Sequence, residues 1–217
     1  DMGSLDPRRY GDWVTTQYAM KKNEEAYEHV FILHHPDEER GACRPLKTAP
    51  CYDRMKKKGA QFGCVNGWER PNYFAYEGFN DKISRSFKRG KWWKYSVKEA
   101  EALRNNLGLI DNTAFTKHLI HGKDSTDFLN WFTCNKLPKI SKINLTYALT
   151  EKGTIRSEYT IIRIEKEKYY LISSGAWQAY DGDFLEKSIE SKSHIYKDLK
   201  CVDVTSMKGV FSIAGPK

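Results

Sequence analysis

One acidic residue inside an alternating, largely apolar stretch is the clearest candidate for chemistry in this sequence. Residues 149–174 read LTEKGTIRSEYTIIRIEKEKYYLISS, and the period of two predicts a long strand. The residues that share one face of that strand are Thr154, Arg156, Glu158, Thr160, Ile162 and Ile164. A carboxylate that faces an apolar layer has its pKa raised, because burial disfavours the charged form, and it can then accept a proton near neutrality. We therefore expect Glu158 to be a candidate general base.

A structural role is the alternative for Glu158. An ion pair with Arg156 or Arg163 within the sheet would also satisfy the carboxylate, and ion pairs of this kind are common. By itself, the pattern favours this structural interpretation.

The strand that carries Glu158 needs a returning strand to hold it. A charged tip at residues 165–168 is followed by a second alternating run, which predicts a β-hairpin. A four-residue tip pairs the Glu158 face with Tyr169, Leu171 and Ser173.

Helices and short strands alternate irregularly along the rest of the chain. Predicted helices cover residues 16–29, 52–58, 96–107, a segment that begins at Asp124, and 179–188, with a capping box at Ser96 and Glu99 opening the third. Further strands are expected at residues 30–33, 109–111, 115–121, 194–204 and 209–214. These elements predict an α+β fold with mixed or antiparallel sheets and flanking helices.

Composition narrows the class of protein. The 217 residues are 40% hydrophobic and 13% aromatic, which suits one or two globular domains with real cores. The five cysteines are odd in number, irregularly spaced and without a CxxC pair, which favours reduced thiols in a cytoplasm or mitochondrial matrix. No apolar run approaches the length of a membrane helix, so no membrane partner is expected. His34 and His35 are neighbours that would point to opposite sides of a strand end, so no metal site is predicted.

Positive charge is concentrated in part of the chain. The formal net charge is +8, and residues 85–95 interleave lysines and arginines with aromatic side chains. Such a segment can bind phosphates and stack bases of single-stranded nucleic acid. It can equally be a segment that crosses a domain with its aromatics anchored and its lysines in water. We favour the second interpretation, so a nucleic-acid partner is not expected.

Several motifs in order resemble one enzyme family. They are DPRRYGDW, TTQY, EERGACRP, YDRMKKKGAQFG, GWERPNYF, SFKRGKWW, LGLIDNTAFTKHLIHGKDSTDFLNW, LTEKGTIRSEYTIIR and SIAGPK. Together they are similar to the middle of the dimethylglycine dehydrogenase and sarcosine dehydrogenase family. The resemblance implies that residues 1–66 are the tail of an FAD oxidoreductase domain and its connecting domain. Residues 67–217 would then be the first part of a folate domain like that of the glycine-cleavage aminomethyltransferases, and both ends would be cuts through a longer polypeptide.

The same resemblance implies a reaction. A flavin oxidises an N-methyl amine to an iminium, and tetrahydrofolate captures the one-carbon unit as 5,10-methylene-tetrahydrofolate. The attacking folate amine must lose a proton, and the family places an acidic residue at the position of Glu158. Many relatives carry aspartate there, so the extra methylene of Glu158 moves the carboxylate by about one bond, on a scale that matters for catalysis.

The resemblance also implies folate contacts. They are expected at Phe115, Thr160, Tyr170, Ile172 and Ser174, with Ser174 at a position where the aminomethyltransferases have asparagine. Phe115 and Ile172 could equally be plain core residues. A face shared by Glu158, Tyr170 and Ile172 conflicts with the register expected from a four-residue tip, so it requires an odd loop or a β-bulge.

The sequence has no motif for binding the dinucleotide FAD. No GxGxxG follows a strand, so we expect FAD to be held by another part of the parent protein. The expected partners are the methylamine substrate, folate and the rest of the same polypeptide. A stand-alone aminomethyltransferase, a basic nucleic-acid-binding module and a degenerate scaffold remain open as alternatives.

Overall fold

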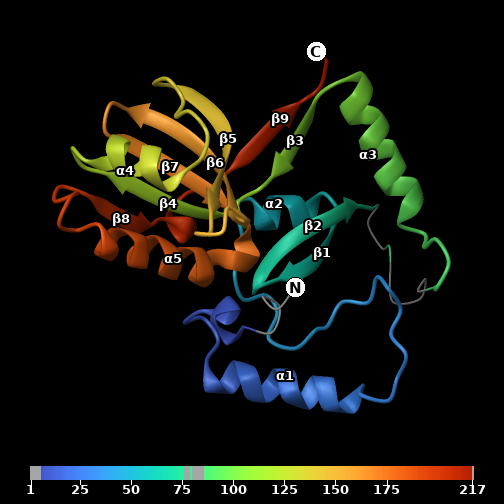
Figure 1. The fold of residues 1–217 in the computed structure, drawn as a ribbon. Helices are drawn as coiled ribbons and strands as arrows, with labels where there is room; N and C mark the ends of the chain where they lie inside the picture. Colours follow the sequence, from blue (N-terminus) through green and yellow to red (C-terminus); the bar gives the residue numbers. More distant parts are fainter. Residues whose placement is uncertain (1–5, 76–78, 80–85, 217) are drawn as a thin grey trace. The chain divides into compact units, whose positions relative to one another are not determined.

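The computed structural model describes residues 6–75, 79 and 86–216. The chain divides into two compact units (Figure 1). Unit 1 comprises Asp1–Gly11 and Phe115–Lys208, and unit 2 comprises Asp12–Ala114 and Gly209–Lys217.

Among the described residues, no helix is long and apolar enough to cross a membrane. No group of three or more His, Cys, Asp or Glu that could hold a metal ion occurs in the same ranges.

Unit 1 is built on a five-stranded antiparallel sheet in the order β5-β6-β7-β4-β8. Its strands are β4 (Thr116–His121), β5 (Lys142–Leu149), β6 (Ile155–Glu165), β7 (Lys168–Ser173) and β8 (Lys200–Asp203). Its helices are α4 (Ser125–Phe132) and α5 (Gln178–Ser191), with short 3-10 turns η2 (Pro7–Tyr10), η4 (Gly175–Trp177) and η5 (Thr205–Met207). The predicted helices and the α+β class are confirmed.

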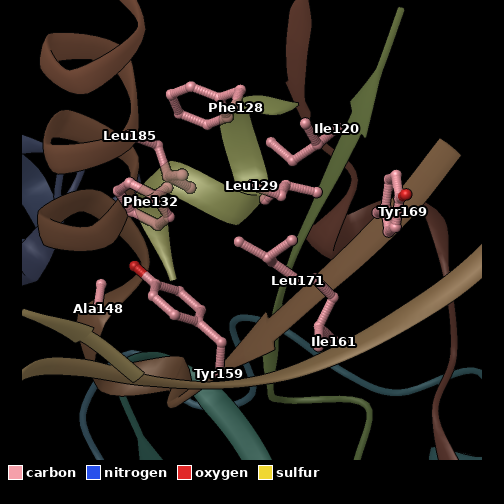
Figure 2. Close-up of a cluster of buried hydrophobic side chains, with 10 residues drawn as sticks. All are labelled: Ile120, Phe128, Leu129, Phe132, Ala148, Tyr159, Ile161, Tyr169, Leu171 and Leu185. Carbon is pink, nitrogen blue, oxygen red and sulfur yellow. The ribbon is translucent and has the colours of Figure 1, made fainter. Parts of the chain in front are cut away.

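The core of unit 1 lies between the sheet and its two helices (Figure 2). Its fully or nearly fully buried members are Ile120, Phe128, Leu129, Phe132, Ala148, Tyr159, Ile161, Tyr169, Leu171 and Leu185. Phe132 stacks on Phe128 at 5.4 Å between ring centroids and lies 5.1 Å from the ring of Phe184 on α5. The helices therefore cover the sheet face that carries Tyr159 and Ile161, and the alternate residues of β6 belong to the other face.

A β-bulge at the tip of the β6–β7 hairpin sets its register. Thr160 pairs with Ile172 and Ile162 pairs with Tyr170, and the register shifts between Arg163 and Glu165. The register predicted from a four-residue tip is therefore wrong, because one strand holds an extra residue before the turn. The Arg163 guanidinium donates to the carbonyl oxygen of Lys166 at 2.7 Å and to that of Glu165 at 3.4 Å, which stabilises this tip.

Unit 2 contains two small antiparallel sheets. The hairpin of β1 (Ala60–Val65) and β2 (Trp68–Phe74) turns at Asn66 and Gly67, whose φ angles of 50° and 78° are in the left-handed region. The second sheet pairs β3 (Gly108–Asp111) with β9 (Phe211–Ala214). The helices are α1 (Thr16–Glu28), α2 (Tyr52–Lys57) and α3 (Trp93–Asn105). The predicted domain boundary at residues 66 and 67 falls at this turn and stays a prediction.

A bidentate ion pair lies beside this hairpin. The Arg44 guanidinium donates to both carboxylate oxygens of Glu69, at 2.8 and 2.6 Å, and to the carbonyl oxygen of Phe62 at 2.9 Å. Because the Glu69 side chain is almost completely buried, this pairing compensates a charge that would otherwise be costly inside the unit.

Three local predictions are wrong. Residues 30–33 form turns rather than a buried strand, and Phe31 and Leu33 are 96% and 80% exposed. α3 begins at Trp93, so Ser96 lies inside the helix, and the Glu99 carboxylate accepts instead from the backbone N–H of Phe74 at 2.6 Å. Of the strand expected at residues 194–204, only β8 forms, because residues 192–196 continue α5 as backbone turns.

His118 is a buried titratable residue of unit 1. It is 3% exposed, and its Nδ1 has no hydrogen-bond partner among the described residues. Burial lowers the pKa of His118, although the nearby carboxylates of Asp203, Asp181 and Glu186 act to raise it. The unfolded chain therefore binds a proton more readily, so this contribution to stability is complete above about pH 6.5 and is lost as the pH falls below it.

We expect the urea midpoint of unfolding to fall between about pH 7 and pH 5, because a folded state with a neutral buried histidine competes with a protonated unfolded chain. His118→Gln should flatten this part of the profile. An identical slope in the variant would show that His118 is not the group responsible.

Candidate functional site

The second face of the five-stranded sheet is the candidate site, and it is called the Glu158 face below. Its central row runs through cross-strand partners Leu145, Thr160, Ile172 and Lys117. Adjacent rows add Tyr147 opposite Glu158 and the partners Ile143, Ile162, Tyr170 and Leu119. In contrast to the residues that alternate with them, these side chains lie away from α4 and α5.

Glu158 is exposed rather than buried. The prediction that it faces an interior apolar layer is wrong, because the helices cover the opposite face of β6. Its neighbour is Tyr147, directly across on β5. A side-chain hydrogen bond to the Glu158 carboxylate raises the pKa of the Tyr147 phenol, so the phenol remains protonated and can donate to the carboxylate.

The two arginines considered as ion-pair partners of Glu158 contact other groups instead. Arg156 lies with its guanidinium 3.5 Å from the ring centroid of Tyr180 on α5. Arg163 donates to carbonyl oxygens at the hairpin tip and lies 5.2 Å from the ring centroid of Tyr169. In the part of the chain that the structure describes, neither arginine forms a salt bridge with Glu158. The structural alternative therefore has no support in the geometry.

Thr160, Ile172 and Tyr170 lie together beside Glu158, as the resemblance implied. All three are half-buried, and Thr160 pairs directly with Ile172. Leu145 and Ile143 extend the surface on β5 and are 49% and 57% exposed. The result is a largely apolar sheet surface with a hydroxyl and a carboxylate on one strand.

The other two expected contacts flank this surface at the ends of strands. Phe115 immediately precedes β4 and is 38% exposed. Ser174 follows β7 and caps η4, where its Oγ accepts from the N–H of Ala176 at 3.3 Å. Its carbonyl oxygen accepts from the Thr116 hydroxyl at 3.1 Å. The side chain of Ser174 is therefore engaged in holding the strand end.

Two residues of the Glu158 face were missed by the sequence reasoning. Tyr147 was read only as the entrance to the hairpin, although alternation along residues 142–149 places it on one side with Leu145 and Ile143. Lys117 lies between Ile172 and the β8 edge, and its Nζ donates to the carbonyl oxygen of Phe115 at 2.7 Å. Although Lys117 is a lysine, it is only 2% exposed. A charged residue inside the run of residues 115–121 was the available signal.

This arrangement suits a ligand with a flat apolar body and a basic nitrogen. The isoleucine and aromatic side chains can pack against a ring system, since such pockets are mainly apolar with a few placed polar groups. The carboxylate of Glu158, on the residue directly opposite Tyr147 in the sheet, can hydrogen-bond to a nitrogen and accept its proton.

Comparisons with known proteins agree with this geometry. The chain is 31% identical to mitochondrial dimethylglycine dehydrogenase from Mus musculus over 216 residues, and these cover 100% of the chain and 24% of that protein. It is 31% identical to the Homo sapiens enzyme of the same name over 218 residues, or 25% of that protein. The chain thus spans about a quarter of the length of these relatives. The resemblance seen in the sequence motifs is confirmed.

A solved structure has the same fold. It is the glycine cleavage system aminomethyltransferase T from Bartonella henselae, with a TM-score of 0.62 and 21% sequence identity. The superposed region covers 79% of this chain and 41% of the Bartonella henselae chain. Residues 1–49 match the FAD dependent oxidoreductase central domain. Residues 51–217, which include the whole Glu158 face, match the GCVT N-terminal domain, and the chain therefore belongs to that family.

Proposed function

We propose that this chain is part of a flavin-dependent N-methyl amine dehydrogenase and that its Glu158 face receives tetrahydrofolate. The observation that carries the proposal is the Tyr147–Glu158 pair beside the apolar surface of Thr160, Ile172 and Tyr170. Membership of the GCVT N-terminal domain family supports it, as does the similarity, along the whole of this chain, to a quarter of the proteins named dimethylglycine dehydrogenase.

In this proposal the residues of this chain bind and orient tetrahydrofolate and remove the proton from its attacking amine. Tyr170, Ile172 and Phe115 pack against the pterin, and Thr160 donates or accepts a hydrogen bond at its edge. As one folate amine attacks the iminium carbon, the first C–N bond forms and the amine proton passes to the Glu158 carboxylate. The second folate nitrogen then forms the other C–N bond while the bond from that carbon to the substrate amine breaks, and the departing amine takes a proton. Tyr147 keeps that carboxylate in position through its hydrogen bond. The products are 5,10-methylene-tetrahydrofolate and the demethylated amine.

FAD belongs to the parent protein in this proposal. It supplies the oxidation of the methylamine when bound, and no residue of this chain is assigned to holding it, since no GxGxxG follows a strand here. We assign residues 1–66 to the oxidoreductase tail and connecting domain and residues 67–217 to the folate domain. The rest of the same polypeptide is then the principal partner. We place the protein in the cytoplasm, or in the mitochondrial matrix if its source is a eukaryote, and the mitochondrial names of its relatives support the second location.

No described contact favours the nucleic-acid alternative. The Arg89 guanidinium lies 3.9 Å from the ring centroid of Trp93, and the Lys94 amine lies 5.0 Å from that of Tyr95. These aromatic faces already contact cations of the same segment, so they are less accessible to bases. Arg85, which begins the basic run, lies outside the described residues.

The test is to follow the methyl carbon in the full-length polypeptide that contains this chain. Dimethylglycine and sarcosine labelled with ¹³C in the N-methyl group are supplied in turn, with and without tetrahydrofolate. With folate, we expect the label in the methylene carbon of methylene-tetrahydrofolate and a matching fall in formaldehyde. Release of all label as formaldehyde at saturating folate, for both amines, would contradict the proposal.

A further inference from the structure

A second bulge in β6 lies two residues before Glu158. The pairing of β5 with β6 shifts between Ala148 and Leu149, so Ser157 pairs with Ala148 and the next pair is Leu149 with Ile155. Arg156 is therefore the extra residue, and it leaves the face that strand alternation would give it. From Ser157 onward the pairing is regular, so Glu158 lies on the face opposite Ser157 and Tyr159.

Helix α5 contacts both residues of this bulge. Asp181, in the first turn of α5, accepts a hydrogen bond from the Ser157 hydroxyl through Oδ1 at 2.5 Å. The Arg156 guanidinium lies 3.5 Å from the ring centroid of Tyr180 and 4.8 Å from that of Phe184. Arg156 and Ser157, consecutive in the strand, therefore both point toward α5, which regular alternation forbids.

Asp181 is a costly residue to place at this position. It is 1% exposed, and a buried carboxylate is tolerated only when hydrogen bonds and nearby charges compensate it. Its Oδ1 accepts from the Ser157 hydroxyl. Burial and the charge of Asp181 also raise the pKa of Tyr159, the next inward residue of β6, so its phenol remains neutral. The buried carboxylate thus holds the strand through Ser157, the residue immediately before Glu158.

We propose that Asp181 and Ser157 are positioning residues that anchor β6 to α5 immediately before Glu158 and thereby hold the Glu158 carboxylate opposite Tyr147 and at the folate. The proposal rests on the proposed function for its chemical consequence. The hydrogen bond holds Ser157 against α5, and the next peptide carries Glu158. Without this anchor, the strand can shift relative to α5 at this point, which moves the Glu158 carboxylate away from Tyr147.

The experiment uses the full-length polypeptide with Ser157→Ala, and Ser157→Thr as the variant that keeps the hydroxyl. Formation of methylene-tetrahydrofolate should fall by about 10- to 100-fold in Ser157→Ala, because a displacement of about 1 Å costs that much in a positioned group. Flavin reduction by the amine should be unchanged, and Ser157→Thr should retain most of the folate-dependent rate. Asp181→Ala should resemble Ser157→Ala.

Asp183→Ala is the matched control on the same helix. Asp183 pairs with the exposed Lys187 of α5 at 2.8 Å, so its loss removes a carboxylate from the same helix while leaving the Ser157–Asp181 hydrogen bond in place. We expect its folate-dependent rate to equal that of the unmodified protein. A loss as large as that of Asp181→Ala would overturn the proposal, because it would assign the effect to the helix as a whole.

Two further measurements separate this proposal from the assignment of Glu158 itself. In a Glu158→Gln background, Ser157→Ala should add little further loss, whereas independent, multiplied losses would overturn a role through Glu158. A crystal structure of Ser157→Ala should show the Glu158 carboxylate moved away from the Tyr147 phenol, a result that does not depend on the reaction. An unmoved carboxylate would overturn the proposal even if Glu158→Gln abolishes folate capture.

Discussion

Replacing Glu158 by glutamine in the full-length polypeptide should lower the formation of 5,10-methylene-tetrahydrofolate by about 100-fold or more, the usual scale for loss of a general base. Glutamine keeps the shape of the side chain and can still accept a hydrogen bond from Tyr147, but it cannot take the amine proton. Flavin reduction should proceed at the normal rate, since that chemistry is assigned to another domain. The uncaptured iminium would then hydrolyse and release formaldehyde.

The measurement is the partition of the methyl carbon between methylene-tetrahydrofolate and formaldehyde, with flavin reduction followed in parallel by stopped flow. Glu165→Gln is the matched control, because Glu165 ends the same strand and pairs with Lys168 at 3.2 Å in an exposed position. It should leave both products unchanged. If Glu158→Gln gave the normal yield and rate of methylene-tetrahydrofolate, Glu158 would not be the base.

The neighbours Leu171 and Ile172 should respond to alanine substitution in opposite ways. Leu171 is 0% exposed and lies in the core beneath α4 and α5 (Figure 2), so Leu171→Ala should lower the free energy of unfolding by about 2–5 kcal/mol. Ile172 lies on the Glu158 face and is half-buried, so Ile172→Ala should cost about 1 kcal/mol. The reason is that only the first substitution leaves a cavity in a packed interior.

Urea unfolding followed by circular dichroism measures the change in the free energy of unfolding of the 217-residue chain. The effect on folate binding is measured in the full-length polypeptide, as the folate concentration that gives half-maximal formation of methylene-tetrahydrofolate. That concentration should rise several-fold in Ile172→Ala, since burying about two lost methylene groups against a ring is worth about 1–2 kcal/mol. Equal destabilisation by the two substitutions would contradict the assignment of the two faces of β7.

The local pattern of the sequence determined much of this protein. Alternation over residues 149–174 correctly predicted the β6–β7 hairpin, because a strand places successive side chains on opposite sides whatever surrounds it. The ends of α1 and α2 were predicted to within one residue, whereas α5 continues three residues beyond the predicted end at Ser188. The ordered motifs led to the right family, and with it to the shared face of Glu158, Thr160 and Ile172.

Tertiary structure decided which face of β6 is covered and where its register shifts. Alternation defines two faces, but the aromatic side chains of α4 and α5 select the one with Tyr159 and Ile161, so Glu158 is exposed. Both bulges depend on contacts that strand periodicity does not encode. Arg156 leaves the Glu158 face because Tyr180 and Asp181, more than twenty residues later in the sequence, hold the bulge against α5. The one-residue shift at Arg156 changes the face of Arg156 and of the residues before it, whereas Glu158 and Thr160 keep the shared face that alternation predicted.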